Sequence, residues 1–177
     1  MVEPWIDGIL RRPDLFQSDE AMVDLGVGKN MVRSIRHWCL ATRVLEEGDF
    51  LPQTRTRRLA PSTFGNSIFL EPGFDPYLGD DATLWLLHWH LASNTARATT
   101  WYWAFNLYKE QDFSRETLLL ALKRVVEERN LSRVSDSSLK SDVACFLRTY
   151  VTGKVPVEKP EGGIVFQIRI VSRFQED

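Results

Sequence analysis

One short stretch, residues 28–39, most constrains the fold, because a helix that begins there would place two kinds of side chain on opposite faces. The apolar residues recur at helical spacing and are Met31, Ile35, Trp38 and Cys39. The polar face carries Lys29, Asn30, Arg33, Arg36, His37 and Arg43. A helix that packs through an apolar face and leaves a basic face outside is typical of a DNA-recognition helix.

The flanking residues predict that this helix belongs to a winged helix-turn-helix. A short helix is expected over residues 19–25, followed by a turn that contains Gly26 and Gly28. Residues 44–59 are typical of two short strands around a loop at residues 46–49, which would form a β-hairpin wing. The wing would bring Arg55, Arg57 and Arg58 to a DNA backbone. We therefore expect residues 1–72 to form a winged-helix domain.

A turn-rich segment at residues 71–76 precedes a change to an aromatic, helical composition, so a second module is predicted over residues 73–151. Helices are expected over residues 83–92 and 100–109. They carry Trp85, Trp89, Trp101, Trp103 and Phe105. We interpret these rings as a packed core that joins the two modules, and stacking on nucleic-acid bases is the alternative.

The end of the second module predicts another helix-turn-helix-like unit, with Ser114 and Ser135 as helix N-caps. The apolar residues of its last helix follow those of residues 31–39 at the same spacing, 108 positions later, and are Leu139, Val143, Phe146 and Leu147. Its basic residues are Arg133, Lys140 and Arg148, offset in part by Asp136 and Asp142. This helix is a second candidate DNA contact or a surface for a protein partner.

Residues 152–177 are rich in proline, glycine and charge and predict a linker followed by a terminal strand at residues 164–171. That strand would pair with the second module, with another copy of the chain, or with sequence beyond it. The architecture as a whole is predicted to be mainly α.

The bulk composition bounds the class of protein. With 44% hydrophobic residues the chain is typical of folded soluble proteins, and its net charge of -2 means that DNA binding must come from local patches. Two cysteines without a Cys-x-x-Cys pair argue against a disulfide scaffold or a zinc ribbon. No charged leader and no long apolar run occurs, so we expect a cytoplasmic protein without membrane contact.

Catalytic motifs are not evident. Residues 26–30 depart from a phosphate-binding loop, because Val23 stands where its first glycine belongs and Asn30 replaces the hydroxyl residue. His88 and His90 are two positions apart and would point in different directions on a helix. We expect no metal, no cofactor and no catalytic activity of its own. Nuclease chemistry with carboxylates from several segments stays open as the alternative.

Four strings together carry a resemblance to a known family: residues 25–38 (LGVGKNMVRSIRHW), 75–78 (DPYL), 82–89 (ATLWLLHW) and 98–103 (ATTWYW). They resemble the bacterial family named domain of unknown function four thousand and seven, over roughly residues 7–151. The resemblance implies a genetic context beside DNA phosphorothioation genes, which exchange a non-bridging phosphate oxygen for sulfur, and near sulfurtransferase-like or restriction components of phage defence. After Val151 the chain departs from longer members.

These observations predict a DNA-binding accessory or targeting subunit of a phosphorothioation-linked modification or restriction system. A transcriptional regulator of the defence operon and a protein adaptor for a sulfurtransferase or nuclease are the alternatives. The expected partners are double-stranded DNA, with or without phosphorothioate, and proteins of the modification or restriction machinery, and self-association stays open.

Overall fold

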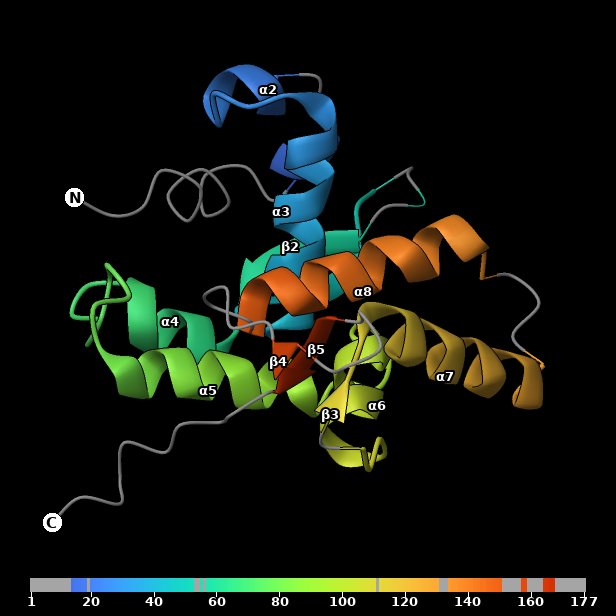
Figure 1. Cartoon of the computed structure of the whole chain (residues 1–177). Helices are drawn as coiled ribbons and strands as arrows, with labels where there is room; N and C mark the ends of the chain where they lie inside the picture. Colours follow the sequence, from blue (N-terminus) through green and yellow to red (C-terminus); the bar gives the residue numbers. More distant parts are fainter. Residues whose placement is uncertain are drawn as a thin grey trace, which may run out of the picture. The chain divides into compact units, whose positions relative to one another are not determined.

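The computed structural model describes residues 14–18, 20–52, 55, 57–110, 112–130, 134–150, 157–158 and 164–167 of the chain. The backbone divides into two compact units, Met1–Asn106 (unit 1) and Leu107–Asp177 (unit 2). Helices dominate the described residues of both units (Figure 1), so the prediction of a mainly helical protein is confirmed. The predicted division into domains at residues 1–72, 73–151 and 152–177 stays a prediction.

Unit 1 starts with three short helical elements, η1 (Leu15–Gln17), α2 (Ala21–Asp24) and α3 (Lys29–Ala41). The turn between α2 and α3 contains Gly26, whose φ of 64° lies in the left-handed region that glycine adopts without strain. All three elements contribute side chains to one apolar core, which the following hairpin completes. The core consists of Leu15, Phe16, Ala21, Val32, Leu40, Leu45 and Leu59.

The buried face of α3 differs from the predicted one by about one residue. Met31 was expected in the core, but its side chain is 58% exposed, whereas the neighbouring Val32 is 4% exposed. Val32 packs together with Ile35 and Cys39 against the core that η1 and α2 form. The expectation for Met31 was therefore wrong, because the partners of a helix decide which side of it is buried and spacing alone does not show them.

The predicted hairpin is present as strands β1 (Leu45–Phe50) and β2 (Arg57–Pro61), which pair antiparallel. The predicted loop at residues 46–49 was wrong, because Glu46 pairs with Ala60 and Glu47 with Leu59. The chain reverses only between Phe50 and Arg57. An irregularity in the register between Glu47 and Phe50 accommodates the turn-like residues at positions 48 and 49 within the strand.

Helices α4 (Thr63–Phe69), α5 (Asp81–Ala92) and α6 (Thr99–Asn106) complete unit 1. The hydroxyl of Ser62 accepts the N–H of Gly65 and caps α4. Gly65 also lies against the backbone of Val44, where a Cβ atom would stand 2.1 Å from the carbonyl oxygen. Glycine is thus required where α4 approaches the chain before β1.

The aromatic residues of α5 and α6 differ in burial. Trp101 and Trp103 on α6 are 3% and 6% exposed, and Trp101 contacts Trp38 of α3 edge-on with ring centroids 5.0 Å apart. Trp85 and Trp89 on α5 are 42% and 61% exposed. The Trp101 ring therefore connects α6 to α3, whereas the two tryptophan rings of α5 reach the surface. Their role between the two modules stays a prediction.

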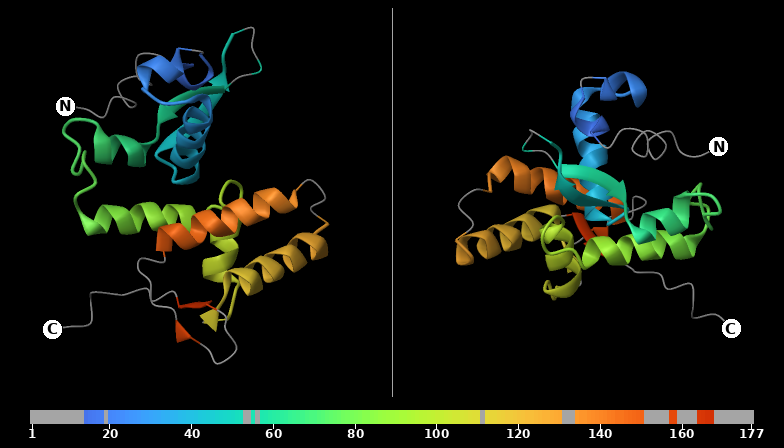
Figure 2. Two further views of the ribbon diagram at one scale, coloured as in Figure 1. Left: turned by 45° about the horizontal axis from the view of Figure 1, so that its top comes forward. Right: turned by 180° about the vertical axis from the view of Figure 1, so that it is seen from behind.

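Unit 2 consists of a helical pair and short strands. α7 (Arg115–Glu128) and α8 (Asp136–Tyr150) lie side by side in every view of Figures 1 and 2. The predicted caps are confirmed, since the Ser114 hydroxyl accepts the N–H of Thr117 at 3.1 Å and the Ser135 hydroxyl accepts that of Ser138 at 3.2 Å. The four predicted apolar residues of α8 are all buried: Leu139, Val143, Phe146 and Leu147.

Three strands of unit 2 form a small antiparallel sheet in the order β3 (Asp112–Phe113), β5 (Ile164–Gln167), β4 (Val157–Glu158). The predicted terminal strand therefore pairs within its own unit, and residues 168–171 lie outside the described residues. In the described part of the chain, no helix combines the length and the apolar character that crossing a bilayer requires.

A candidate nucleic-acid interface

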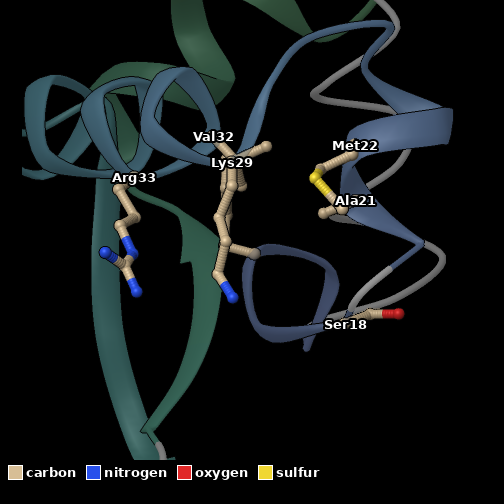
Figure 3. Close-up of a pocket in the computed structure, with 7 residues that line it drawn as sticks. Ser18, Ala21, Met22, Lys29, Val32 and Arg33 are labelled. Carbon is tan, nitrogen blue, oxygen red and sulfur yellow. The ribbon is translucent and has the colours of Figure 1, made fainter.

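Three predicted contact residues occupy the first turns of α3. Lys29, Asn30 and Arg33 are all exposed. Lys29 and Arg33 are one helical turn apart and extend in the same direction (Figure 3). Within the described residues, no acidic side chain forms an ion pair with either of them. This end of α3 therefore presents two cations and an amide to solvent.

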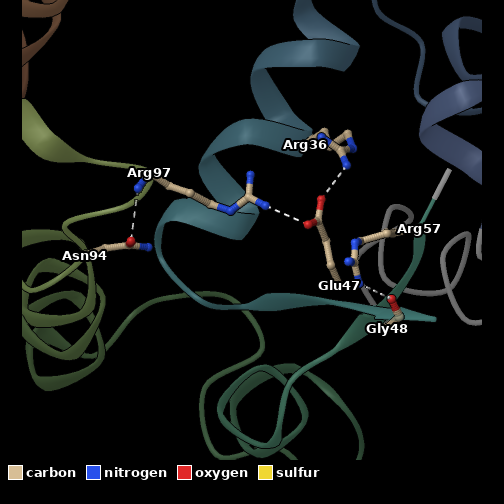
Figure 4. Close-up of polar contacts among 6 residues, drawn as sticks. All are labelled: Arg36, Glu47, Gly48, Arg57, Asn94 and Arg97. Carbon is tan, nitrogen blue, oxygen red and sulfur yellow. Dashed lines mark hydrogen bonds and ion pairs between the residues drawn. The ribbon is translucent and has the colours of Figure 1, made fainter. Parts of the chain in front are cut away.

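Arg36, predicted to belong to the same stripe, has a partner in the protein. Its guanidinium donates to one carboxylate oxygen of Glu47 on β1 at 2.8 Å, and Arg97 donates to the other oxygen at the same distance (Figure 4). The side chains of these residues are between 24% and 35% exposed. One acid thus holds two arginines, and Arg36 links α3 to the hairpin.

Asn94 places the third member of this cluster. Its side-chain oxygen accepts the N–H groups of Ala96 and Arg97 at 3.2 and 3.1 Å, which shapes the loop before α6. Its amide nitrogen donates to the carbonyl of Ala41 at the end of α3, at 2.9 Å. Asn94 is buried, so the loop that carries Arg97 is fixed to α3 by a satisfied polar group.

His37 and Arg43 lie on the C-terminal part of the predicted stripe. His37 is exposed, and its ring meets that of Trp38 edge-on at 5.1 Å. Arg43 is exposed and follows α3 with a φ of 58°. Its carbonyl accepts the hydroxyl of Ser62 at 2.6 Å, which fixes the backbone where the chain leaves the helix. Burial and the charge of Arg43 lower the pKa of His90.

The arginines of the hairpin also differ from one another. Arg55, Arg57 and Arg58 are all exposed. Arg57 donates to the carbonyl of Gly48 at 3.2 Å and lies over the ring of Phe50, 4.4 Å from its centroid. This packing holds the Arg57 side chain along the hairpin, where it still reaches solvent.

A pocket of about 230 Å³ lies between α2 and the first turns of α3 (Figure 3). Its lining combines the two exposed cations of α3 with apolar side chains from η1, α2 and α3. It consists of Phe16, Ser18, Ala21, Met22, Lys29, Val32 and Arg33. The exposure of the two cations agrees with the predicted basic stripe, whereas no sequence pattern indicates the pocket beside them.

The second candidate contact lies in unit 2 and is described in part. Lys140 and Arg148 are exposed on α8, whereas Arg133 lies outside the described residues. Asp136 pairs with Lys123 of α7, and that hydrogen bond lowers the pKa of its carboxyl. Its contact with DNA stays a prediction.

Among the described residues, no group of three or more His, Cys, Asp or Glu side chains is placed to hold a metal ion. His88 packs edge-on against Phe105 with centroids 4.6 Å apart, and burial lowers its pKa. The structure thus surrounds His88 with aromatic side chains.

Comparisons with known proteins give one family and two related structures. The model of the family described as "Protein of unknown function (DUF4007)" matches residues 5–166. The structure titled "SspB crystal structure" is 32% identical, with a TM-score of 0.71, over 82% of this chain and 45% of the SspB chain. "Magnesium ion-bound SspB crystal structure" is 34% identical, with a TM-score of 0.70, over 82% and 44%. The chain thus spans less than half the length of these SspB chains. Among curated proteins, none matches it.

Proposed function

The chain belongs to the DUF4007 family, and on that premise we propose that it binds double-stranded DNA as the targeting or accessory subunit of a phosphorothioation-linked modification or restriction system. The binding element is a winged helix-turn-helix made of α2, α3 and the β1–β2 hairpin. The observation that carries the proposal is that Lys29, Asn30 and Arg33 are exposed together at the start of α3, directly after the turn.

The residues divide into those that contact DNA and those that hold the element together. Lys29 and Arg33 would pair with phosphates, and Asn30 would reach a base edge. Arg57 and Arg58 would contact the backbone from the hairpin. Arg36 holds Glu47 instead, so it positions the hairpin against the recognition helix. His37, Arg43 and Arg55, with Lys140 and Arg148 of α8, remain further candidate contacts.

The link to phosphorothioation rests on the family resemblance of residues 25–38, 75–78, 82–89 and 98–103. The similar solved structures carry the name SspB, and one of them holds magnesium, which is a property of that protein. This chain covers less than half of each SspB chain. Metal-dependent chemistry is therefore not assigned to it, and cleavage of DNA on addition of magnesium would test for such chemistry.

The decisive experiment compares charge removal at two places. DNA affinity is measured by fluorescence anisotropy on one duplex between about 50 and about 200 mM salt, where counterion release dominates. The test variant is Lys29→Gln/Arg33→Gln. The control is Arg115→Gln/Arg124→Gln, which removes the same charge from exposed positions of α7. We expect the test variant to bind more weakly, with a salt slope lower by about two, one for each phosphate contact.

The outcomes separate the candidate functions. A wild-type chain that does not bind, or a test variant that behaves like the control, would refute DNA binding through α3. Tight preference for the operon's own promoter would indicate a transcriptional regulator. Cleavage of the duplex on addition of magnesium would show that the chain is an enzyme.

A protein adaptor is the second candidate, because α5 exposes several large apolar side chains. They are Leu84, Trp85, Leu86 and Trp89, exposed between 41% and 61%. Apolar surface of this kind marks contact sites in proteins. Copurification with a sulfurtransferase or nuclease of the system, without affinity for DNA, would favour this function.

A further inference from the structure

The pocket between α2 and α3 combines positive charge with apolar side chains. Lys29 and Arg33 supply positive charge on one side, and Met22 faces them from α2 (Figure 3). Phe16 and Val32 are 8% and 4% exposed and form apolar wall. The ligand should therefore be an anion with one part that tolerates apolar contact.

The Ser18 hydroxyl accepts the N–H of Glu20 at 3.1 Å, and in Figure 3 it lies away from Lys29. Among the described side chains of the lining, the charged hydrogen-bond donors for an anion are those of Lys29 and Arg33. One side of a bound anion would therefore be paired, and the other would contact carbon and the sulfur of Met22.

The size of the pocket favours one chemical group over a whole ligand. Its volume of about 230 Å³ is below the roughly 300–1,000 Å³ of sites that enclose drug-sized molecules. A single phosphate group of a polynucleotide, with the adjoining sugar outside, suits that volume.

The apolar wall then distinguishes between two forms of such a group. A phosphate oxygen turned toward Met22 and Val32 would lose its water without gaining a hydrogen bond, which is unfavourable. Sulfur is large, polarizable and weakly hydrated, and contact with apolar side chains is favourable for it. A phosphorothioate offers sulfur to one wall while its remaining non-bridging oxygen meets Lys29 and Arg33.

We infer that this pocket receives one phosphorothioate of the DNA backbone and is the part of the interface that distinguishes it from phosphate. The inference rests on the proposed function, because it requires α3 to approach DNA. Replacing one of two non-bridging oxygens makes the phosphorus a stereocentre, and the two walls of the pocket differ. One diastereomer should therefore place its sulfur against the apolar wall and bind more tightly than the other.

The test compares Met22→Gln with Met31→Gln in the full chain. Both methionines are exposed, at 38% and 58%, but only Met22 lines the pocket. Affinities are measured on three duplexes of one sequence, which carry a phosphate or one of the two phosphorothioate diastereomers at a single position. One apolar group in a pocket changes selectivity by about tenfold or more, so we expect about a tenfold preference of the wild type for one phosphorothioate diastereomer. Met22→Gln should reduce it to about threefold or less by the same argument, and Met31→Gln should leave it unchanged.

The possible failures are distinguishable. If none of the three duplexes binds, the proposed function fails. If the wild type binds the two diastereomers alike, or binds neither of them more tightly than the phosphate duplex, DNA binding stands and the inference is overturned. The diastereomer comparison uses the wild type alone, so it decides the matter even where Met22→Gln does not fold. An equal effect of the two methionine variants would also overturn it.

Discussion

Replacing Glu47 with glutamine tests whether one carboxylate holds helix α3 to the rest of unit 1. The substitution keeps the size of the side chain and one carbonyl oxygen, but it removes the charge and one of the two acceptors. Arg36 and Arg97 each donate to Glu47 at 2.8 Å. Glutamine can accept from one of them and presents an N–H₂ group to the other.

The expected cost follows from the geometry. A hydrogen bond to a charged group contributes about 1.5–3 kcal/mol when it is buried, whereas an exposed ion pair contributes about 0.2–1 kcal/mol. The side chains here are 24–35% exposed, which places the cluster between these limits. We expect Glu47→Gln to lower the free energy of unfolding by about 1–2 kcal/mol after discounting for solvent screening.

Urea unfolding followed by tryptophan fluorescence measures this change in unit 1, because all six tryptophans lie within residues 1–106. The matched control is Glu46→Gln, an exposed neighbour on the same strand, which should change stability by about 0.5 kcal/mol or less. The difference between the two variants should shrink with added salt. A double-mutant cycle with Arg97→Gln should give a coupling energy of about 0.5 kcal/mol or more.

Equal destabilisation by Glu46→Gln and Glu47→Gln, or a cycle with Arg97→Gln that showed no coupling, would contradict this role of Glu47. The Glu47→Gln variant should also change the affinity for DNA, and in the opposite direction to its change in stability. Under the proposed function, removal of a negative charge beside α3 should increase affinity for DNA while it lowers stability.

Three further predictions follow from other sites. Gly65→Ala should lower the free energy of unfolding by about 1–3 kcal/mol in urea titration, because its Cβ would stand 2.1 Å from the carbonyl oxygen of Val44, whereas Asn66→Ala on the same helix should have a much smaller effect. Stability should fall as the pH is lowered through about 6.5, because burial lowers the pKa of both His88 and His90 in the folded state and the unfolded state therefore takes up protons first. His90→Gln should remove its share of this dependence, and an unchanged slope would contradict it. Burial raises the pKa of the Cys39 thiol to about 12, so in a Cys145→Ser variant iodoacetamide should modify Cys39 only after unfolding, as mass spectrometry would show.

Local patterns predicted local structure well. The caps at Ser114 and Ser135 and the buried side of α8 depend on residues within a few positions of one another, so spacing was sufficient to find them. The hairpin was predicted but its loop was not. Residues 46–49 have the composition of a turn. Glu46 and Glu47 nevertheless pair with β2, and composition alone does not predict this pairing.

Contacts between distant segments could not be predicted. Glu47 is 11 residues from Arg36 and 50 from Arg97, and no motif in the sequence connects them. The pocket also depends on contacts between separate segments, because Met22 and Arg33 line it together only when α2 packs on α3. Exposure of Lys29, Asn30 and Arg33 agreed with the predicted basic stripe, whereas the ion pair of Arg36 required the folded hairpin.

The two kinds of cation on α3 have a consequence for how such proteins diversify. Because Arg36 is committed to Glu47 while Lys29 and Arg33 point outward, exchange of the outward residues leaves the scaffold intact. Among homologues that bind DNA in the same way, position 30 should therefore vary with the target sequence, whereas the phosphate-binding residues at positions 29 and 33 and the trio at 36, 47 and 97 should be retained.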